Sequence, residues 1–236
     1  MRSQVAFVLI HSPLVGPFTW SLVADALHAH QIEALVPSLI DSESDARPYW
    51  QQYASAVARE LASVPAHCSL ILVGHSGAGP LLPAIRQFVP HRVAAYFFVD
   101  AGLPRHGASR LELLAAESSA LATHVRHHLE SGGRFPEWTD DQLCTIIPNP
   151  QDRKQLLAEI QPRALPFFTE PIPVFEGWPD APCVYIQFSA SYDSSLQFAL
   201  QKGWLIHILK GDHFHMLVEP EIVTQVLIEA AHKVTA

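Results

Sequence analysis

The chain has 236 residues, of which 49% are hydrophobic and 16% are charged, so it can bury the core of one domain. Its formal net charge is −8 and it has no run of basic residues, which argues against nucleic-acid binding. Cys68, Cys144 and Cys183 lie far apart and indicate neither a disulfide framework nor a zinc site. Reduced thiols are typical of a cytoplasmic protein, which is the location we expect. No apolar stretch reaches about 18 residues, so no membrane span is expected.

The first hundred residues alternate between buried strands and helices. Apolar runs predict strands at residues 5–10, 33–36, 70–73 and 92–99. Between them, helices are expected at residues 20–30, with Thr19 as the N-cap, at 48–63 and at 81–89. Alternation at this spacing predicts a parallel sheet with helices on both faces.

Residues 105–182 interrupt this alternation. Helices are expected at 110–130, 139–146 and 152–164, followed by a tail rich in proline and aromatic residues. An apolar helical insertion after the carboxyl end of a strand predicts a lid over the active-site face. Phe167, Phe168, Phe175 and Trp178 of the tail, with the apolar loop at residues 14–18, indicate an apolar acyl pocket.

The alternation resumes with strands expected at 183–189 and 204–209 and helices at 194–202 and 220–233. The prediction is therefore one α/β domain over residues 1–236, a doubly wound, mostly parallel sheet of six strands with a helical lid.

Residues 69–79, SLILVGHSGAG, place a serine at the tip of a strand–turn–helix unit. Such a turn needs small neighbours, which Gly74, Ala78 and Gly79 supply. The unit resembles the nucleophile elbow of the α/β-hydrolase family, with Ser76 as nucleophile and Ala78 in place of the last glycine. The resemblance covers nearly the whole chain, which looks like a trimmed member that lacks the N-terminal hairpin and starts at the third family strand.

The resemblance implies a histidine base in the loop after the last strand. His213 fits, because residues 211–220 resemble a stretch of plant-type esterases and of many small bacterial hydrolases. His215 is the competing candidate. For the acid, Asp100 after the fourth strand is preferred over Asp193, which follows the fifth strand but could simply cap a helix.

Two backbone N–H groups complete the expected site. The resemblance implies an oxyanion hole made by Gly77, beside the nucleophile, and by Ser12, in the loop after the first strand. Residues near these groups are candidate substrate contacts: His11, Leu14, Phe18, His75 and His215. His124 and His128 have metal-ligand spacing without an acidic third ligand, so we expect a solvated helix face, no metal and no cofactor.

The preferred interpretation is a serine hydrolase that cleaves a small apolar carboxylic ester through an acyl-enzyme. The same residues are compatible with a hydroxynitrile lyase or an acyltransferase. A non-catalytic binding protein on this fold is the remaining alternative, although neither nucleophile nor base is lost. The expected partner is a small-molecule ester, with no nucleic acid or membrane, and the sequence does not indicate an oligomeric state.

Overall fold

Six parallel strands form one sheet, in the order β2-β1-β3-β4-β5-β6, in the computed structural model of the chain, which describes residues 5–235. This confirms the predicted fold class. The strands are β1 (Val5–Ile10), β2 (Glu33–Leu35), β3 (Ser69–His75), β4 (Val93–Val99), β5 (Cys183–Gln187) and β6 (Leu205–Ile208).

Helices cover both faces of the sheet. Those outside residues 105–182 are α1 (Phe18–Ala29), α2 (Tyr49–Glu60), α3 (Leu82–Phe88), α9 (Asp193–Gln201), α10 (His215–Val218) and α11 (Pro220–Thr235). Three short 3₁₀ helices span Leu61–Ser63, Ser76–Leu81 and Ala190–Tyr192. Within residues 5–235, no helix is both long and apolar enough to cross a membrane.

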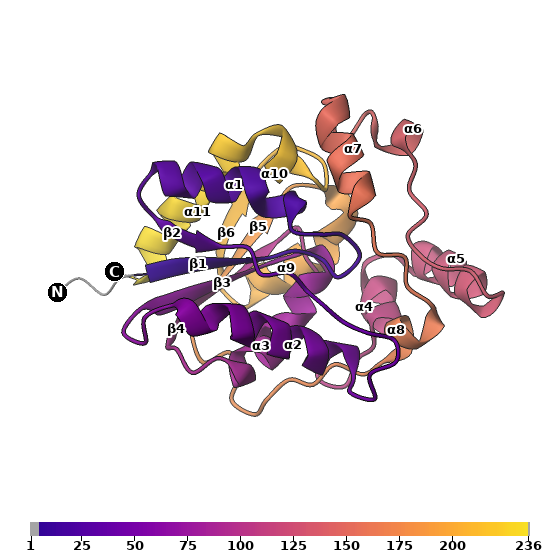
Figure 1. Cartoon of the computed structure of the whole chain (residues 1–236), viewed down its shortest axis with the longest axis horizontal. Coiled ribbons are helices and arrows are strands. Elements are labelled where there is room, and N and C mark those ends of the chain that lie inside the picture. Colours follow the sequence, from indigo (N-terminus) through magenta and orange to yellow (C-terminus); the bar gives the residue numbers. More distant parts are fainter. Residues whose placement is uncertain (1–4, 236) are drawn as a thin grey trace.

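Alternate residues of β1 point to opposite faces and build two cores. Val8 and Ile10 belong to a core that also contains buried side chains of α2 and α3, whereas Phe7 and Leu9 pack with those of α1 and α11. Figure 1 shows α1 and α11 on one side of the sheet and α2 and α3 on the other. The sheet is thus buried on both faces, as its continuous apolar strands require.

The segment at residues 105–182, called the inserted segment below, contains five helices: α4 (Arg110–Glu117), α5 (Ser119–Glu130), α6 (Asp140–Leu143), α7 (Pro150–Ala158) and α8 (Leu165–Thr169). They lie beyond the carboxyl ends of the strands (Figure 1). The single helix expected at 110–130 is wrong. Ser118 is extended, with φ −148°, and its side chain accepts from the Leu121 N–H to start α5 afresh.

Other expected boundaries also shift for local reasons. Helix α1 begins before Thr19, whose hydroxyl donates to the Gly16 carbonyl oxygen instead of capping the helix. Helix α7 starts at Pro150, earlier than expected, because the Asn149 side chain caps it by accepting from the Gln151 N–H. The short helices α8 and α10 lack the length over which apolar periodicity can be recognised, so the sequence did not predict them.

Carboxylates hold the inserted segment against the rest of the chain. Glu170 accepts hydrogen bonds from the Tyr49 and Trp50 N–H groups at the start of α2, at 2.6 and 3.1 Å. Asp41 forms a two-pronged ion pair with Arg163, at 2.6 and 2.7 Å, and both side chains are at least 91% buried. The segment is therefore docked on the carboxyl edge of the sheet by contacts far apart in sequence.

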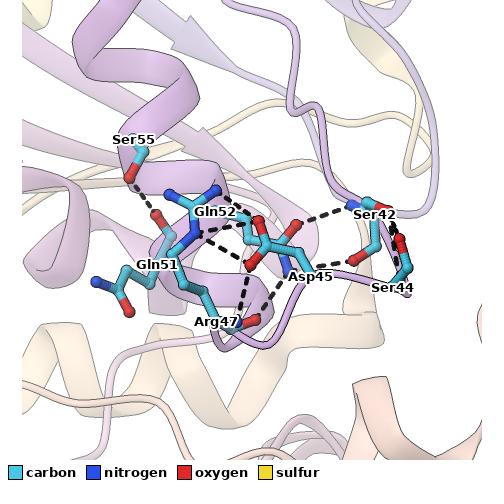
Figure 2. Close-up of polar contacts among 7 residues, drawn as sticks. All are labelled: Ser42, Ser44, Asp45, Arg47, Gln51, Gln52 and Ser55. Carbon is cyan, nitrogen blue, oxygen red and sulfur yellow. Dashed lines mark hydrogen bonds and ion pairs between the residues drawn. The ribbon is translucent and has the colours of Figure 1, made fainter.

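The loop that carries Asp41 is itself tied to α2 (Figure 2). Buried Gln52 accepts from the Ser42 N–H at 2.8 Å and donates to the Arg47 carbonyl oxygen, also at 2.8 Å. Arg47 and Asp45 form an exposed ion pair at the tip of the same loop. One side-chain amide thus closes the loop against the helix that follows it.

Candidate active site

Ser76 lies at the sharp turn after β3 with φ +56°, in the left-handed region that non-glycine residues rarely adopt. Close packing forces the turn. A Cβ on Gly74 would lie 3.1 Å from the backbone of Ala78 and Gly79, and a Cβ on Gly79 would lie 2.3 Å from the Gly102 carbonyl oxygen. The methyl group of Ala78 fits because it is buried in the core. The departure from glycine at Ala78 therefore leaves the turn intact.

A series of hydrogen bonds links Ser76, His213 and Asp100. Ser76 Oγ is 3.0 Å from His213 Nε2, and His213 Nδ1 is 2.7 Å from Asp100 Oδ2. Since Nδ1 faces a carboxylate, it carries the ring hydrogen, which leaves Nε2 to accept the Ser76 hydroxyl. The His213 side chain is 23% exposed, so this arrangement can be reached from solvent.

Asp100 is fully buried at the end of β4, next to the end of β3 in the sheet. Its carboxylate accepts from the N–H groups of Phe188 and Ser189, each at 2.9 Å, and from the Ser189 hydroxyl at 2.8 Å. Burial alone would raise the pKa of Asp100, but the hydrogen bond and charge of His213 and these N–H groups hold that pKa below its ordinary value. The carboxyl group therefore stays ionised beside His213.

Left-handed backbone marks both ends of this series. Within residues 5–235, only Gln31, Ser76 and Asp100 have positive φ without being glycine. Such conformations cost of order 1–3 kcal/mol and cluster at functional sites. Ser76 and Asp100 follow neighbouring strands directly, so both turns place a side chain at the same edge of the sheet.

Asp193, the alternative acid, is placed elsewhere. It is exposed at the first position of α9, where it accepts from Gln187 Nε2 at 2.6 Å. The structure brings Asp100, and not Asp193, to His213.

The loop of His213 is anchored by His75, the residue before the nucleophile. His75 Nε2 lies 2.9 Å from the His213 carbonyl oxygen, which can only accept, so His75 donates. Burial lowers the pKa of His75 well below its ordinary value, which keeps the ring neutral. Because His75 is fully buried, its expected contact with substrate is corrected to a supporting role.

The loop after β1 approaches the elbow. A Cβ on Gly77 would lie 3.3 Å from Ser12 Oγ, so the two residues expected to supply the oxyanion-hole N–H groups are neighbours. His11 lies beneath this loop, 2% exposed, with Nδ1 2.8 Å from the Ser12 carbonyl oxygen and Nε2 accepting from the Leu39 N–H. Burial lowers the pKa of His11 to about 4. His11 therefore supports the loop instead of contacting substrate.

The remaining expected contacts differ in placement. His215 is 8% exposed and packs against Phe188 with ring centroids 5.4 Å apart, so it is turned into the protein. Leu14 and Phe18 are half-buried beside the inserted segment. The Leu14 carbonyl accepts from the Gln161 N–H, and the Phe18 N–H donates to the Glu159 carboxylate.

Phe167 and Trp178 of the aromatic tail pack into the core instead of lining the expected acyl pocket. Phe167 is 1% exposed and lies under the Arg110 guanidinium, 4.0 Å from the ring centroid. Trp178 packs on Tyr96 and Phe98, at 5.8 and 6.2 Å between centroids. These side chains build the core under the inserted segment, because apolar composition alone does not separate core from pocket.

Trp138 of the inserted segment lies nearer to the site. Its ring is half-buried and meets Phe214 edge-on, with centroids 5.7 Å apart, and Phe214 in turn contacts the His213 ring at 5.1 Å. The inserted segment therefore reaches the residue that follows the histidine.

Two neighbours of the series were missed from the sequence. Tyr192 Oη lies 3.1 Å from Ser76 Oγ, and Ser189 donates to Asp100. Both follow β5, at the carboxyl edge where parallel strands of this fold class place functional loops. Their position after β5 could have indicated both residues, but the sequence analysis considered only Asp193 there.

A metal site is not evident in the part of the chain that the structure describes. No three His, Cys, Asp or Glu side chains between residues 5 and 235 are grouped to hold an ion. The three cysteines are free thiols.

Comparison with known proteins points to esterases. No family model matches the chain. Methylesterase 2 of Arabidopsis thaliana is 24% identical, covering 95% of each chain, and Methylesterase 17 of the same plant is 27% identical over 69% of this chain. The match to Methylesterase 17 spans 59% of that protein, less than two thirds of its length.

Solved structures share the fold. An extracellular α/β-hydrolase from a Paenibacillus species, described as a structural and functional homologue of tobacco salicylic acid binding protein 2, superimposes with a TM-score of 0.75 at 18% identity. It covers 96% of this chain and 98% of its own. Polyneuridine aldehyde esterase gives a TM-score of 0.73 at 18% identity, with the same coverage of both chains. At this identity the likeness concerns the fold.

Proposed function

We propose that the chain is an esterase of the α/β-hydrolase family and that it hydrolyses a small carboxylic ester through a Ser76–His213–Asp100 triad. The observation that carries the proposal is the unbroken series of hydrogen bonds from Ser76 Oγ through His213 to Asp100. Because relatives that match this chain are methylesterases, a methyl ester is the first substrate to test.

In the first half of the reaction, His213 Nε2 takes the proton of the Ser76 hydroxyl as the oxygen attacks the ester carbonyl carbon. The hydrogen bond from Nδ1 to ionised Asp100 keeps the imidazole in the required tautomer and stabilises the imidazolium that forms. His213 then gives this proton to the leaving oxygen, the alcohol departs, and an acyl-enzyme remains on Ser76.

The negative charge that develops on the carbonyl oxygen needs donors already in place. We assign this role to the backbone N–H groups of Gly77 and Ser12, which lie on the two loops that meet at the elbow. Gly77 follows the left-handed Ser76 at the start of the 3₁₀ helix. One such donor contributes about 10²–10³ in kcat in serine hydrolases.

The second half repeats these steps with water. His213 takes a proton from a water molecule, which attacks the acyl carbon, and then returns a proton to Ser76 Oγ as the acid is released. In this proposal the inserted segment acts as a lid, with Trp138 above Phe214 bounding the site beside His213. A site bounded in this way favours a small substrate.

Two measurements test the proposal. A fluorophosphonate probe should label the wild-type protein at Ser76, located by peptide mass spectrometry, and should leave Ser76→Ala unlabelled. On a panel of methyl and p-nitrophenyl esters, Ser76→Ala should lose activity by about 10⁴-fold or more. Absence of labelling, or equal turnover by both proteins, would contradict the proposal, and cyanide release from mandelonitrile without ester hydrolysis would replace it with a lyase.

A further inference from the structure

Tyr192 contacts two members of the hydrogen-bonded series at once. Its hydroxyl lies 3.1 Å from Ser76 Oγ, and its ring stacks on the His213 imidazole, with centroids 5.6 Å apart and planes inclined by 23°. The residue ends the 3₁₀ helix Ala190–Tyr192 and immediately precedes α9. Within residues 5–235, Tyr192 and His213 are the two residues whose side chains hydrogen-bond to the Ser76 hydroxyl.

The direction of this hydrogen bond follows from the rest of the series. Ser76 has one hydroxyl hydrogen, and His213 Nε2 accepts it because Nδ1 carries the ring hydrogen toward Asp100. The contact with Tyr192 therefore uses the phenol hydrogen and a lone pair of Ser76 Oγ. Burial raises the pKa of Tyr192 above its ordinary value, so the phenol keeps this hydrogen at neutral pH.

The backbone around Tyr192 is fixed to the same carboxylate that orients the base. Ser189 donates from its hydroxyl to Asp100 and accepts from the Ser191 N–H at 3.4 Å, which caps the 3₁₀ helix. Two residues into α9, Ser195 hydrogen-bonds through its hydroxyl to Glu117 of the inserted segment. The phenol is thus held between two anchored stretches of chain, as a preorganised donor must be.

We propose that Tyr192 is a catalytic hydrogen-bond donor whose hydroxyl changes its acceptor from Ser76 Oγ to the leaving oxygen of the ester; the inference rests on the proposed function. When Oγ bonds to the carbonyl carbon, the lone pair that faced Tyr192 is used for the new bond or changes direction, so the phenol loses this acceptor. The leaving oxygen sits on that same carbon, next to Oγ. A small rotation of the phenol within its stack on His213 brings the hydroxyl to it.

The proton balance distinguishes Tyr192 from the base. His213 transfers the proton that it took from Ser76 to the leaving oxygen, the carbon–oxygen bond breaks, and the alcohol departs. Tyr192 keeps its own hydrogen throughout and donates only a hydrogen bond to the oxygen on which charge develops. Its contribution is therefore large for a basic leaving group such as methoxide and small for p-nitrophenolate, which needs little stabilisation.

The test compares two esters of one acid, methyl and p-nitrophenyl, in the wild type and in Tyr192→Phe, which keeps the ring and removes the hydroxyl. We expect kcat/KM, which reports the acylation step, to fall about 10- to 100-fold for the methyl ester and less than about threefold for the p-nitrophenyl ester. Tyr49→Phe, which removes a phenol hydroxyl from α2, serves as the matched control and should leave both rates unchanged.

Fluorophosphonate labelling distinguishes a failure of the role proposed for Tyr192 from a failure of the proposed hydrolase function. Tyr192→Phe should label at Ser76 within about threefold of the wild-type rate, because fluoride is a good leaving group. No loss with either ester, or an equal loss with both, would overturn the role in leaving-group stabilisation while the proposed hydrolase function stands. A wild-type protein that neither labels nor hydrolyses any ester would overturn both.

Discussion

The side chain of His75 donates a hydrogen bond to the backbone carbonyl oxygen of His213, at 2.9 Å, across 138 positions of the sequence. The two rings also lie 4.5 Å apart between centroids, and Trp20 meets His75 edge-on. The residue before the proposed nucleophile therefore fixes the loop that carries the proposed base. The distance between Ser76 and His213 depends on this contact, because both ends of it are adjacent to the reacting groups.

The first prediction concerns this anchor. His75→Phe keeps a ring in the buried site but removes the donor, leaving the His213 carbonyl oxygen without its partner. We expect the free energy of unfolding to fall by about 1–3 kcal/mol and kcat to fall about 10- to 100-fold, because the imidazole loses its fixed position. Urea unfolding and ester kinetics measure the two effects. His75→Gln can restore an N–H donor, so it should recover part of kcat. Equal activity of His75→Phe and the wild type would refute the anchoring role.

The second prediction separates the two candidate acids. Asp100→Asn can still accept from the Phe188 and Ser189 N–H groups, but its amide would face His213 Nδ1 and favour the wrong tautomer. We expect kcat to fall by about 10³- to 10⁴-fold with little change in folding. Asp193→Asn, whose side-chain oxygen can still accept from Gln187, is the matched control. A larger loss for Asp193→Asn than for Asp100→Asn would reverse the assignment.

The sharp turn at Ser76 and the position of His213 beside it were predictable because local chemistry marks them. A Cβ on Gly74 would meet the backbone of Ala78 and Gly79 within the same turn, so this part of the pattern is local, and His213 follows a recognisable strand. The contact that requires Gly79 is with Gly102, which lies after the next strand. The choice between Asp100 and Asp193 was harder, because each follows a strand whose carboxyl end lies at the same edge of the sheet. What separates them is a backbone φ of +42° at Asp100 and the N–H groups of Phe188 and Ser189, just after β5, which no sequence pattern records.

The supporting contacts were hidden for the same reason. Tyr192 and His75 act through partners more than 100 positions away, so neither spacing nor composition indicates them. The prediction that Phe167 and Trp178 line a pocket failed for a different reason: a cluster of aromatic residues in an insertion is equally typical of a core. Only the packed structure distinguishes the two outcomes.

The third prediction is a loss of stability in mild acid. The pKa of buried His11 is lowered to about 4, below the ordinary value of 6.5, so between these values the unfolded chain binds a proton that the folded protein does not. Stability from this group is therefore present above pH 6.5 and decreases as pH falls toward 4, by about 2 kcal/mol between pH 7 and pH 5. His75 and His215, whose pKa values are also lowered by burial, act in the same direction.

Urea unfolding at pH 7 and pH 5 measures this effect. In His11→Gln, which can still accept from the Leu39 N–H, the difference in unfolding free energy between the two pH values should decrease by about 2 kcal/mol. The comparison uses the difference between pH values, so a general loss of stability in the variant does not obscure it. An unchanged difference would mean that His11 does not bind its proton in this range on unfolding.

The fourth prediction concerns the loop in Figure 2. Gln52→Ala removes one acceptor and one donor from a buried site, leaving the Ser42 N–H and the Arg47 carbonyl without these partners. We expect the free energy of unfolding to fall by about 2–3 kcal/mol. Gln51→Ala is the matched control, because that side chain points away from the loop in Figure 2, and it should change stability by less than about 0.5 kcal/mol. Equal effects of the two substitutions would show that the amide does not hold the loop.

The last prediction tests the ion pair that docks the inserted segment. Arg163→Met leaves the Asp41 carboxylate buried without its two-pronged partner, which should cost about 3–5 kcal/mol of unfolding free energy. The double variant Asp41→Leu, Arg163→Met buries no unpaired charge, so it should be more stable than Arg163→Met alone. Urea unfolding of the wild type, both single variants and the double variant gives the coupling between the two positions. Arg47→Met, which breaks the exposed pair with Asp45 in the same loop, should leave stability nearly unchanged. If the two single losses simply add in the double variant, then the pair does not act as a unit, and the segment is held by its other contacts, including Glu170 on α2.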